Sequence, residues 1–97
     1  MTKIKTSELQ GAALDWAVAK AVGVDVSSTT IPIYRPSTNW MHLGPLIERH
    51  EVEIEAGPWS ACCGIKTMHG DTILEAACRA IVAAKLGNEV DVPEELV

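Results

Sequence analysis

The chain has 97 residues, of which 47% are hydrophobic and 22% charged, so it suffices for one globular domain, residues 1–97, but not for two. Its formal net charge is −5 and it contains no basic run, which argues against DNA or RNA as a partner. No stretch reaches the roughly 18 apolar residues of a membrane span, and residues 1–5 do not begin a signal peptide, so we expect a cytoplasmic protein with no membrane partner.

Residues 9–22 form the clearest predicted element, a helix. Ser7 and Gln10 have the spacing of a capping box at its start, and Gly23 is a typical helix stop. Apolar side chains occupy both faces of this helix, which predicts burial on more than one side. We therefore expect Trp16 to lie in the core or in a subunit interface, and we expect so small a domain to form a homo-oligomer.

Two shorter elements are predicted next. Residues 31–36 alternate and favour a strand, but Pro32 lacks the amide donor that an inner strand needs, so we predict an edge strand. Gly44 and Pro45 then open a short helix that runs to His50, because proline is favoured at the first helical position.

Residues 51–56 and 59–66 predict a β-hairpin, since both alternate with a period of two around the turn residues Gly57 and Pro58. One face of the first strand is apolar and the other carries three glutamates. Side chains two apart on a strand are about 7 Å from each other, a separation that would suit a metal or an acid–base pair. We favour a solvated outer face for these glutamates: Glu51, Glu53 and Glu55.

The last predicted helix starts at Asp71 or Thr72 and ends at Gly87. Thr72 and Glu75 have capping-box spacing, and Glu75 and Arg79 are one turn apart, as in a surface ion pair. A core stripe is predicted along its length, comprising Leu74, Ala77, Cys78, Ile81 and Ala84. The acidic tail of residues 90–97 either lies against the body of the domain or frays.

This order of elements predicts an α+β fold, with a small antiparallel sheet packed between an N-terminal and a C-terminal helix. The sheet consists of the edge strand and the hairpin. The short helix connects them.

The cysteines and histidines do not form a recognisable catalytic or metal-binding motif. Cys62, Cys63 and Cys78 are an odd number and are interpreted as free thiols, and two adjacent cysteines lack the spacer that lets both grip one metal. The histidines at positions 42, 50 and 69 are dispersed. We therefore predict no catalytic residue, no metal and no cofactor.

Residues 34–49 are the best candidate for a ligand site, because two aromatic rings and two guanidinium groups surround several small polar side chains. Trp40 offers a surface on which a nucleobase can stack, and backbone amides at a helix start near Gly44 favour an anion. The predicted partner is a small, anionic, nucleotide-like ligand. The alternative is that these residues only pack and cap. The predicted ligand-binding residues are Tyr34, Arg35, Ser37, Thr38, Asn39, Trp40, Gly44, Arg49 and Trp59.

Four blocks together carry a family resemblance: residues 5–19, 36–40 (PSTNW), 44–49 (GPLIER) and 70–83. Their succession resembles the NinX-like family of small tailed-phage proteins, a family of unknown function, and spans nearly the whole chain. The resemblance implies a phage accessory protein made in the cytoplasm of an infected bacterium, with no catalytic residues to carry over. The order of elements is also similar to phage sandwich domains, which bears on the fold alone.

Three functions remain open. The first is a non-enzymatic binder that sequesters a small nucleotide-derived host signal and so counters host defence. The second is a protein–protein inhibitor or adaptor acting on a host enzyme, for which the net charge of −5 suits a basic partner. The third is a small hydrolase that uses Glu53 or Glu55 with His50 or His69.

Overall fold

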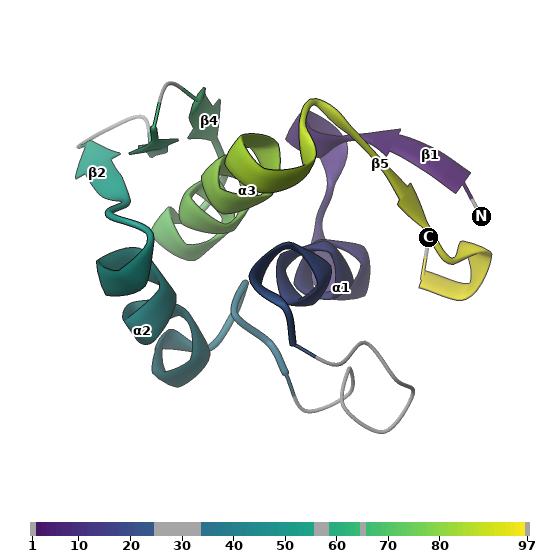
Figure 1. The fold of residues 1–97 in the computed structure, drawn as a ribbon, viewed down its shortest axis with the longest axis horizontal. Coiled ribbons are helices and arrows are strands. Elements are labelled where there is room, and N and C mark those ends of the chain that lie inside the picture. The colour runs from purple at the N-terminus through teal and green to yellow at the C-terminus, as the bar shows by residue number, and fades with distance from the viewer. Residues whose placement is uncertain (1, 25–33, 56–58, 65, 97) are drawn as a thin grey trace.

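The computed structural model describes residues 2–24, 34–55, 59–64 and 66–96 (Figure 1). The predicted α+β class is confirmed. The helices are α1 (Gly11–Val22), α2 (Trp40–Arg49) and α3 (Ile73–Leu86), with short 3₁₀ turns η1 (Thr6–Glu8) and η2 (Glu94–Leu96). The strands are β1 (Thr2–Lys5), β2 (Glu53–Glu55), β3 (Ser60–Cys63), β4 (Lys66–His69) and β5 (Glu89–Val92).

The described strands form two antiparallel sheets rather than one. Strands β2, β3 and β4 form a meander in which Ile54 pairs with Ala61 and Ala61 with Met68. Strand β1 pairs with β5, with Ile4 opposite Val90, so the two ends of the described chain lie together (Figure 1). The acidic tail therefore begins as a strand instead of fraying.

Helix α3 is the middle layer of the molecule. It packs against α1 on one side and against β3 and β4 on the other (Figure 1). Many of its core positions are alanine, which lets the helices approach closely. Trp16 is 5% exposed, so its predicted place in the core is confirmed, and Lys20 Nζ lies 5.1 Å from the centre of its ring. The side chains that are fully buried around this layer include Leu14, Val18, Leu43, Ile81 and Val92.

The start of α1 differs from the prediction. Ser7 lies in η1, and Gln10 is the N-cap residue without a side-chain hydrogen bond, so the predicted capping box is wrong. Thr6 instead ties this turn to the far end of α3, because its hydroxyl donates to the Gly87 carbonyl at 2.7 Å. Gly23 ends α1 with a φ of 83°, the left-handed conformation predicted for a glycine stop.

Helix α2 begins at Trp40, five residues before Pro45, the predicted first helical position. The side chain of Asn39 accepts a hydrogen bond from the Met41 amide at 2.9 Å, and this cap starts the helix at Trp40. Pro45 therefore lies inside the helix, and the prediction that Gly44 and Pro45 open it is wrong. Pro45 has no amide hydrogen to donate to the Met41 carbonyl four residues earlier, and both residues are exposed.

The predicted edge strand falls partly outside the described residues, which resume at residue 34. Tyr34 and Arg35 are not in a strand, and Pro36 begins a turn. This turn is closed by the amides of Thr38 and Asn39, which both donate to the Arg35 carbonyl.

The hairpin is confirmed in β2 and β3. Val52, Ala61 and Cys63 are buried, as predicted for its inner face, whereas Ile54 is 39% exposed. The glutamates of β2 are exposed, as expected. The second strand ends at Cys63, because Gly64 turns with a φ of 64° into β4, where the sequence had predicted a loop at Met68.

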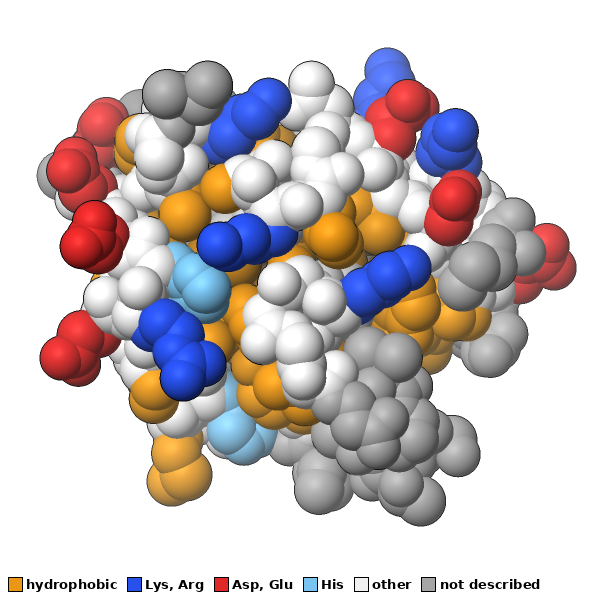
Figure 2. Space-filling model, viewed as in Figure 1, with side chains coloured by type: hydrophobic (Ala, Val, Ile, Leu, Met, Phe, Trp, Pro, Cys, Tyr) orange, Lys and Arg blue, Asp and Glu red, His pale blue; other side chains and the backbone are white. Residues whose placement is uncertain are grey.

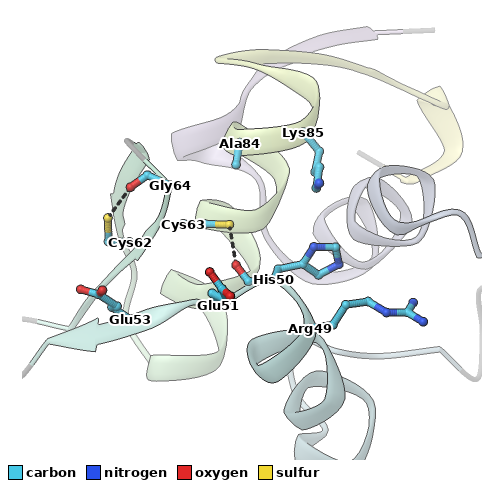
Figure 3. A pocket seen from close by; sticks show the side chains of 9 residues that line it. All are labelled: Arg49, His50, Glu51, Glu53, Cys62, Cys63, Gly64, Ala84 and Lys85. Carbon is cyan, nitrogen blue, oxygen red and sulfur yellow. Dashed lines mark hydrogen bonds between the residues drawn. The ribbon is translucent and has the colours of Figure 1, made fainter.

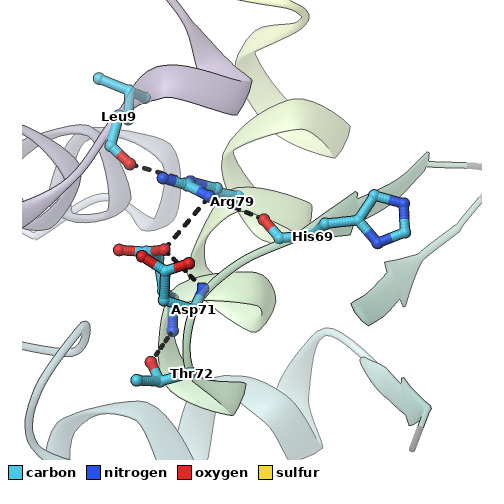
Figure 4. Close-up of polar contacts among 6 residues, drawn as sticks. Leu9, His69, Asp71, Thr72 and Arg79 are labelled. Atoms are coloured by element: carbon cyan, nitrogen blue, oxygen red, sulfur yellow. Dashed lines mark hydrogen bonds and ion pairs between the residues drawn. The ribbon is translucent and has the colours of Figure 1, made fainter. Parts of the chain in front are cut away.

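Helix α3 matches its prediction closely, because Thr72 Oγ1 accepts from the Glu75 amide at 3.1 Å and Gly87 follows the last turn. The pair of Glu75 and Arg79 also forms, at 3.2 Å, but with only 12% of the arginine side chain exposed. Arg79 donates from Nε to the Leu9 carbonyl at 2.9 Å and from Nη1 to the His69 carbonyl at 2.8 Å (Figure 4). It thus joins the start of α1 and the end of β4 to α3. Of the predicted stripe, Ala84 alone is exposed.

Candidate functional site

The predicted ligand-binding residues do not gather in one place. Trp40 and Arg49 are the first and last residues of α2, nine positions and therefore roughly 13–14 Å apart along the axis. Gly44 lies between them, and Trp59 immediately precedes β3. Arg35, Ser37 and Thr38 line one cavity, and Arg49 lines another.

The first cavity, here called the Asp15 pocket, has a volume of about 300 Å³. It lies between the first turns of α1 and the turn that precedes α2. Three predicted residues line it, together with Asp15, whose role the sequence did not indicate. The lining residues are Gly11, Ala12, Asp15, Arg35, Ser37 and Thr38.

Asp15 is the notable group in this pocket, because it is a carboxyl side chain that is only 5% exposed. It accepts a hydrogen bond from the Ser37 amide at 2.8 Å. Burial raises the pKa of Asp15, while Ser37 and the positive charge of Arg35 act in the opposite direction. The Ser37 hydroxyl is buried and has no hydrogen-bond partner of good geometry among the described residues.

Tyr34, His42 and Asn39 hold the turn beside the Asp15 pocket in place. The rings of Tyr34 and His42 stack with their centres 5.2 Å apart, and the Arg35 amide donates to His42 Nδ1 at 2.9 Å. The neutral imidazole therefore carries its proton on Nε2. Trp40 is 50% exposed at the start of α2, where the sequence had placed it over a ligand.

The second cavity, here called the basic pocket, has a volume of about 490 Å³ (Figure 3). It is formed by the end of α2, by β2 and β3, and by the last turn of α3. In Figure 3, Arg49, His50 and Lys85 lie on one side, while Glu53 and Cys62 lie on the other. Arg49 is the predicted site residue found here. The lining residues are Arg49, His50, Glu51, Glu53, Cys62, Cys63, Gly64, Ala84 and Lys85.

Three basic side chains face one another in the basic pocket. Burial lowers the pKa of His50, and the positive charges of Lys85 and Arg49 lower it further. Its Nε2 atom is buried without a hydrogen-bond partner, and within the described parts of the chain neither cation forms an ion pair. Figure 2 shows Lys and Arg side chains set around a histidine on this face, with Asp and Glu at its margins.

Two cations of the basic pocket lie at helix ends, and one residue that lines the pocket has a strained backbone. Arg49 and Lys85 each lie in the last turn of a helix, where the helix dipole stabilises a positive charge. Glu51 adopts a φ of 53°, a left-handed conformation that costs a non-glycine residue roughly 1–2 kcal/mol. Such strain is found preferentially at functional sites.

Burial makes Cys63 and Cys78 poor nucleophiles. Burial raises the pKa of Cys63, and its sulfur lies 3.5 Å from the His50 carbonyl, to which the thiol donates. Cys62 donates to the Gly64 carbonyl at 3.1 Å, and burial raises the pKa of Cys78 strongly. Over the residues that the structure describes, no group of three potential ligands lies in a position to hold a metal ion.

Comparison with known families gives the context of these pockets. The family described as Bacteriophage P22, NinX, matches residues 25–85, which is more than half of the chain. The chain belongs to the NinX family of bacteriophage proteins. The matched region includes all of the residues that line the basic pocket, and it leaves out α1 and the sheet of β1 and β5. A search of curated proteins finds no match, and none of the described helices has the length and apolarity needed to cross a membrane.

Proposed function

We propose that this NinX-family protein is a phage accessory protein that binds a small nucleotide-derived molecule in the cytoplasm of the infected host and sequesters it unchanged, thereby countering host defence. The observation that carries the proposal is the basic pocket, where Arg49, His50 and Lys85 converge and no carboxylate is paired with either cation among the described residues. Glu51 and Glu53 also line the pocket but form no ion pair with either cation in the described parts of the chain, so a phosphate group could pair with Arg49 and Lys85.

The charge distribution supports a phosphate on the basic side. The pKa of His50 is lowered by burial and also by Lys85 and Arg49, so both positive charges act on the same imidazole. An anion placed between them would relieve this repulsion, and the planar guanidinium of Arg49 suits two phosphate oxygens at once. The volume of about 490 Å³ falls within the range of roughly 300–1,000 Å³ that is usual for small-molecule sites.

The opposite side of the pocket supports a nucleotide over a simple phosphate. Glu53 is exposed there and accepts hydrogen bonds only. A nucleobase with amino or ring N–H donors would complement Glu53 while its phosphate meets the basic side. This bipolar lining would disfavour a ligand that is anionic throughout.

Sequestration is favoured over turnover because the pocket has no activated nucleophile among its described residues. Burial raises the pKa of the Cys63 thiol, which disfavours the thiolate, and burial, with smaller contributions from Lys85 and Arg49, lowers the pKa of His50. Of the residues considered for a hydrolase, Glu53 and His50 line this pocket, whereas Glu55 and His69 do not. A hydrolase at this site would therefore have to use Glu53 with His50.

The test is to incubate the purified protein with a pool of cyclic dinucleotides, cyclic ADP-ribose isomers and common nucleotides. Free ligand is removed, the protein is denatured by heat, and the released compounds are identified by mass spectrometry. We expect one intact compound in near-stoichiometric amount. A chemically altered compound would establish an enzyme, and the absence of any retained or altered compound would contradict the proposal.

A second candidate function is the protein–protein inhibitor or adaptor. It is favoured by two adjacent apolar side chains at the start of α2, since Trp40 is 50% and Met41 80% exposed. If they dock a host enzyme, replacing both with alanine should abolish its capture from a lysate while leaving ligand retention unchanged. The predicted homo-oligomer is tested by analytical sedimentation of the wild type and of the variant with Trp40 and Met41 replaced, where a mass above that of one chain is expected for the wild type.

A further inference from the structure

The side of the basic pocket that lies opposite Arg49 and Lys85 presents hydrogen-bond acceptors. Glu53 and Cys62 lie there, on the neighbouring strands β2 and β3, where they are partners across the sheet (Figure 3). The Cys62 thiol already donates its hydrogen to the Gly64 carbonyl at 3.1 Å. The Glu53 side chain is exposed, and a carboxylate has no hydrogen to donate. Among the described residues, the side chains on this side therefore match a ligand edge that carries donors.

Two carboxylates line the pocket, and Glu53 is the one placed for the far end of a ligand. Glu51 directly follows His50 at the end of α2, whereas Glu53 begins β2 and lies across the pocket from the cations (Figure 3). A ligand whose phosphate lies between Arg49 and Lys85 has its opposite end at Glu53. The reverse orientation is disfavoured, because it would bring the phosphate against a carboxylate of the same charge.

Guanine is the common base whose edge best fits a single carboxylate. Its N1–H and its 2-amino group are adjacent donors in one plane, so they can donate to the two carboxylate oxygens of Glu53 together. Adenine and cytosine each place an amino group beside a ring nitrogen that is an acceptor, which a carboxylate repels. Uracil and thymine have one N–H between two carbonyl oxygens. Two parallel charge-assisted hydrogen bonds are stronger and more selective than one, which favours guanine.

We infer that the basic pocket selects guanine nucleotides: Arg49 and Lys85 bind a phosphate, and Glu53 binds the N1–H and 2-amino group of the base. This inference rests on the function proposed above and names the base that this function leaves open. Glu53 determines specificity, while the two cations supply affinity that all nucleotides share. A base that lacks one donor is rejected, because it leaves a charged acceptor without its partner.

The test is isothermal titration calorimetry of the full chain with GMP, IMP and AMP. IMP differs from GMP only in lacking the 2-amino group. The wild type should bind GMP about tenfold or more tightly than either IMP or AMP. The variant Glu53→Gln replaces one acceptor oxygen with an NH₂ group, which would face a donor of guanine. It should bind GMP about tenfold or more weakly than the wild type does, and its preference for GMP over IMP should fall below about threefold.

The matched control is Glu55→Gln, which removes the same charge from an exposed residue of β2 that does not line the pocket. It should keep the wild-type preference for GMP. Replacing both Arg49 and Lys85 with alanine should weaken the binding of all three nucleotides by a similar factor. Equal binding of the three nucleotides by the wild type, or an unchanged preference in Glu53→Gln, would overturn the inference.

Failure of this inference can be told apart from failure of the proposed function. If the wild type binds none of the three nucleotides or binds them equally, but retains a compound from the nucleotide pool through Arg49 and Lys85, the selection of guanine is wrong and sequestration stands. If it binds none of the three and retains nothing from the pool, both are wrong.

Discussion

Arg79 is the side chain whose loss should cost this fold most clearly, and the cost can be worked out from its contacts. It makes two charge-assisted hydrogen bonds, to the carbonyls of Leu9 and His69, and a partly buried ion pair with Glu75 (Figure 4). At about 1.5 kcal/mol for each hydrogen bond and up to about 1 kcal/mol for the ion pair, Arg79→Ala should lower the free energy of unfolding by about 3–4 kcal/mol. That is a large part of the roughly 5–15 kcal/mol available to a small domain.

The assay is urea unfolding followed by tryptophan fluorescence, to which the buried Trp16 contributes together with the exposed Trp40 and Trp59. Lys85→Ala is the matched control, because it removes another cation from α3 that is exposed and forms no ion pair with a described residue. This control should change stability by no more than about 0.5 kcal/mol. If Arg79→Ala costs less than about 1 kcal/mol, or no more than the control, then the contacts of Arg79 do not stabilise the attachment of β4 and the segment before α1 to α3.

The remaining predictions concern backbone space and pH. A Cβ at Gly70 would lie 2.7 Å from the Ala76 amide nitrogen, so Gly70→Ala should destabilise the protein by about 1–3 kcal/mol. A Cβ at Gly44, inside α2, would meet no atom within 4 Å, so Gly44→Ala should stabilise the protein by about 0.5–1 kcal/mol. Both are measured by thermal unfolding. Burial raises the pKa of Asp15 from 3.8, so the folded state binds this proton more tightly than the unfolded state, and the wild type loses stability from this group as the pH rises above 3.8. The stability of Asp15→Asn relative to the wild type should therefore be greater at pH 7 than at pH 3, and the reverse trend would refute the burial argument. The pKa of His50 is lowered from 6.5, so the stability that the neutral imidazole contributes is present above pH 6.5 and is lost as the pH falls through the lowered pKa. The free energy of unfolding of His50→Gln should therefore decrease less on acidification than that of the wild type, and an identical pH dependence would contradict this.

Local signals in the sequence were sufficient for α1, α3 and the hairpin. The cap at Thr72 and the stops at Gly23 and Gly87 depend only on neighbouring residues, and the structure has all three. The start of α2 was missed because two local signals competed there, and the cap at Asn39 prevailed over the proline. Strands β1 and β5 were missed because each has four residues and they pair across nearly the whole length of the chain.

The candidate sites depended on contacts that local patterns do not reveal. Asp15 meets Ser37 across 22 positions, and within the sequence it is a single charge in an alanine-rich helix. Arg49 was predicted, but Lys85 is 36 positions away and reaches the same pocket only because α2 and α3 end near each other (Figure 3). The residue types for an anion site were thus visible in the sequence, while their grouping required the fold.

The most direct test of the basic pocket compares ligand retention by three proteins in parallel: the wild type, Arg49→Ala with Lys85→Ala, and the charge-matched control Lys3→Ala with Lys5→Ala. The control lysines are exposed on β1, so both double variants lose two positive charges. Each protein is incubated with the same nucleotide pool, and the compound released by heat is quantified by mass spectrometry. If the basic pocket holds the phosphate, the wild type and the control retain the same compound in near-stoichiometric amount, and the Arg49 and Lys85 variant retains at least tenfold less. Equal retention by all three proteins would contradict the account.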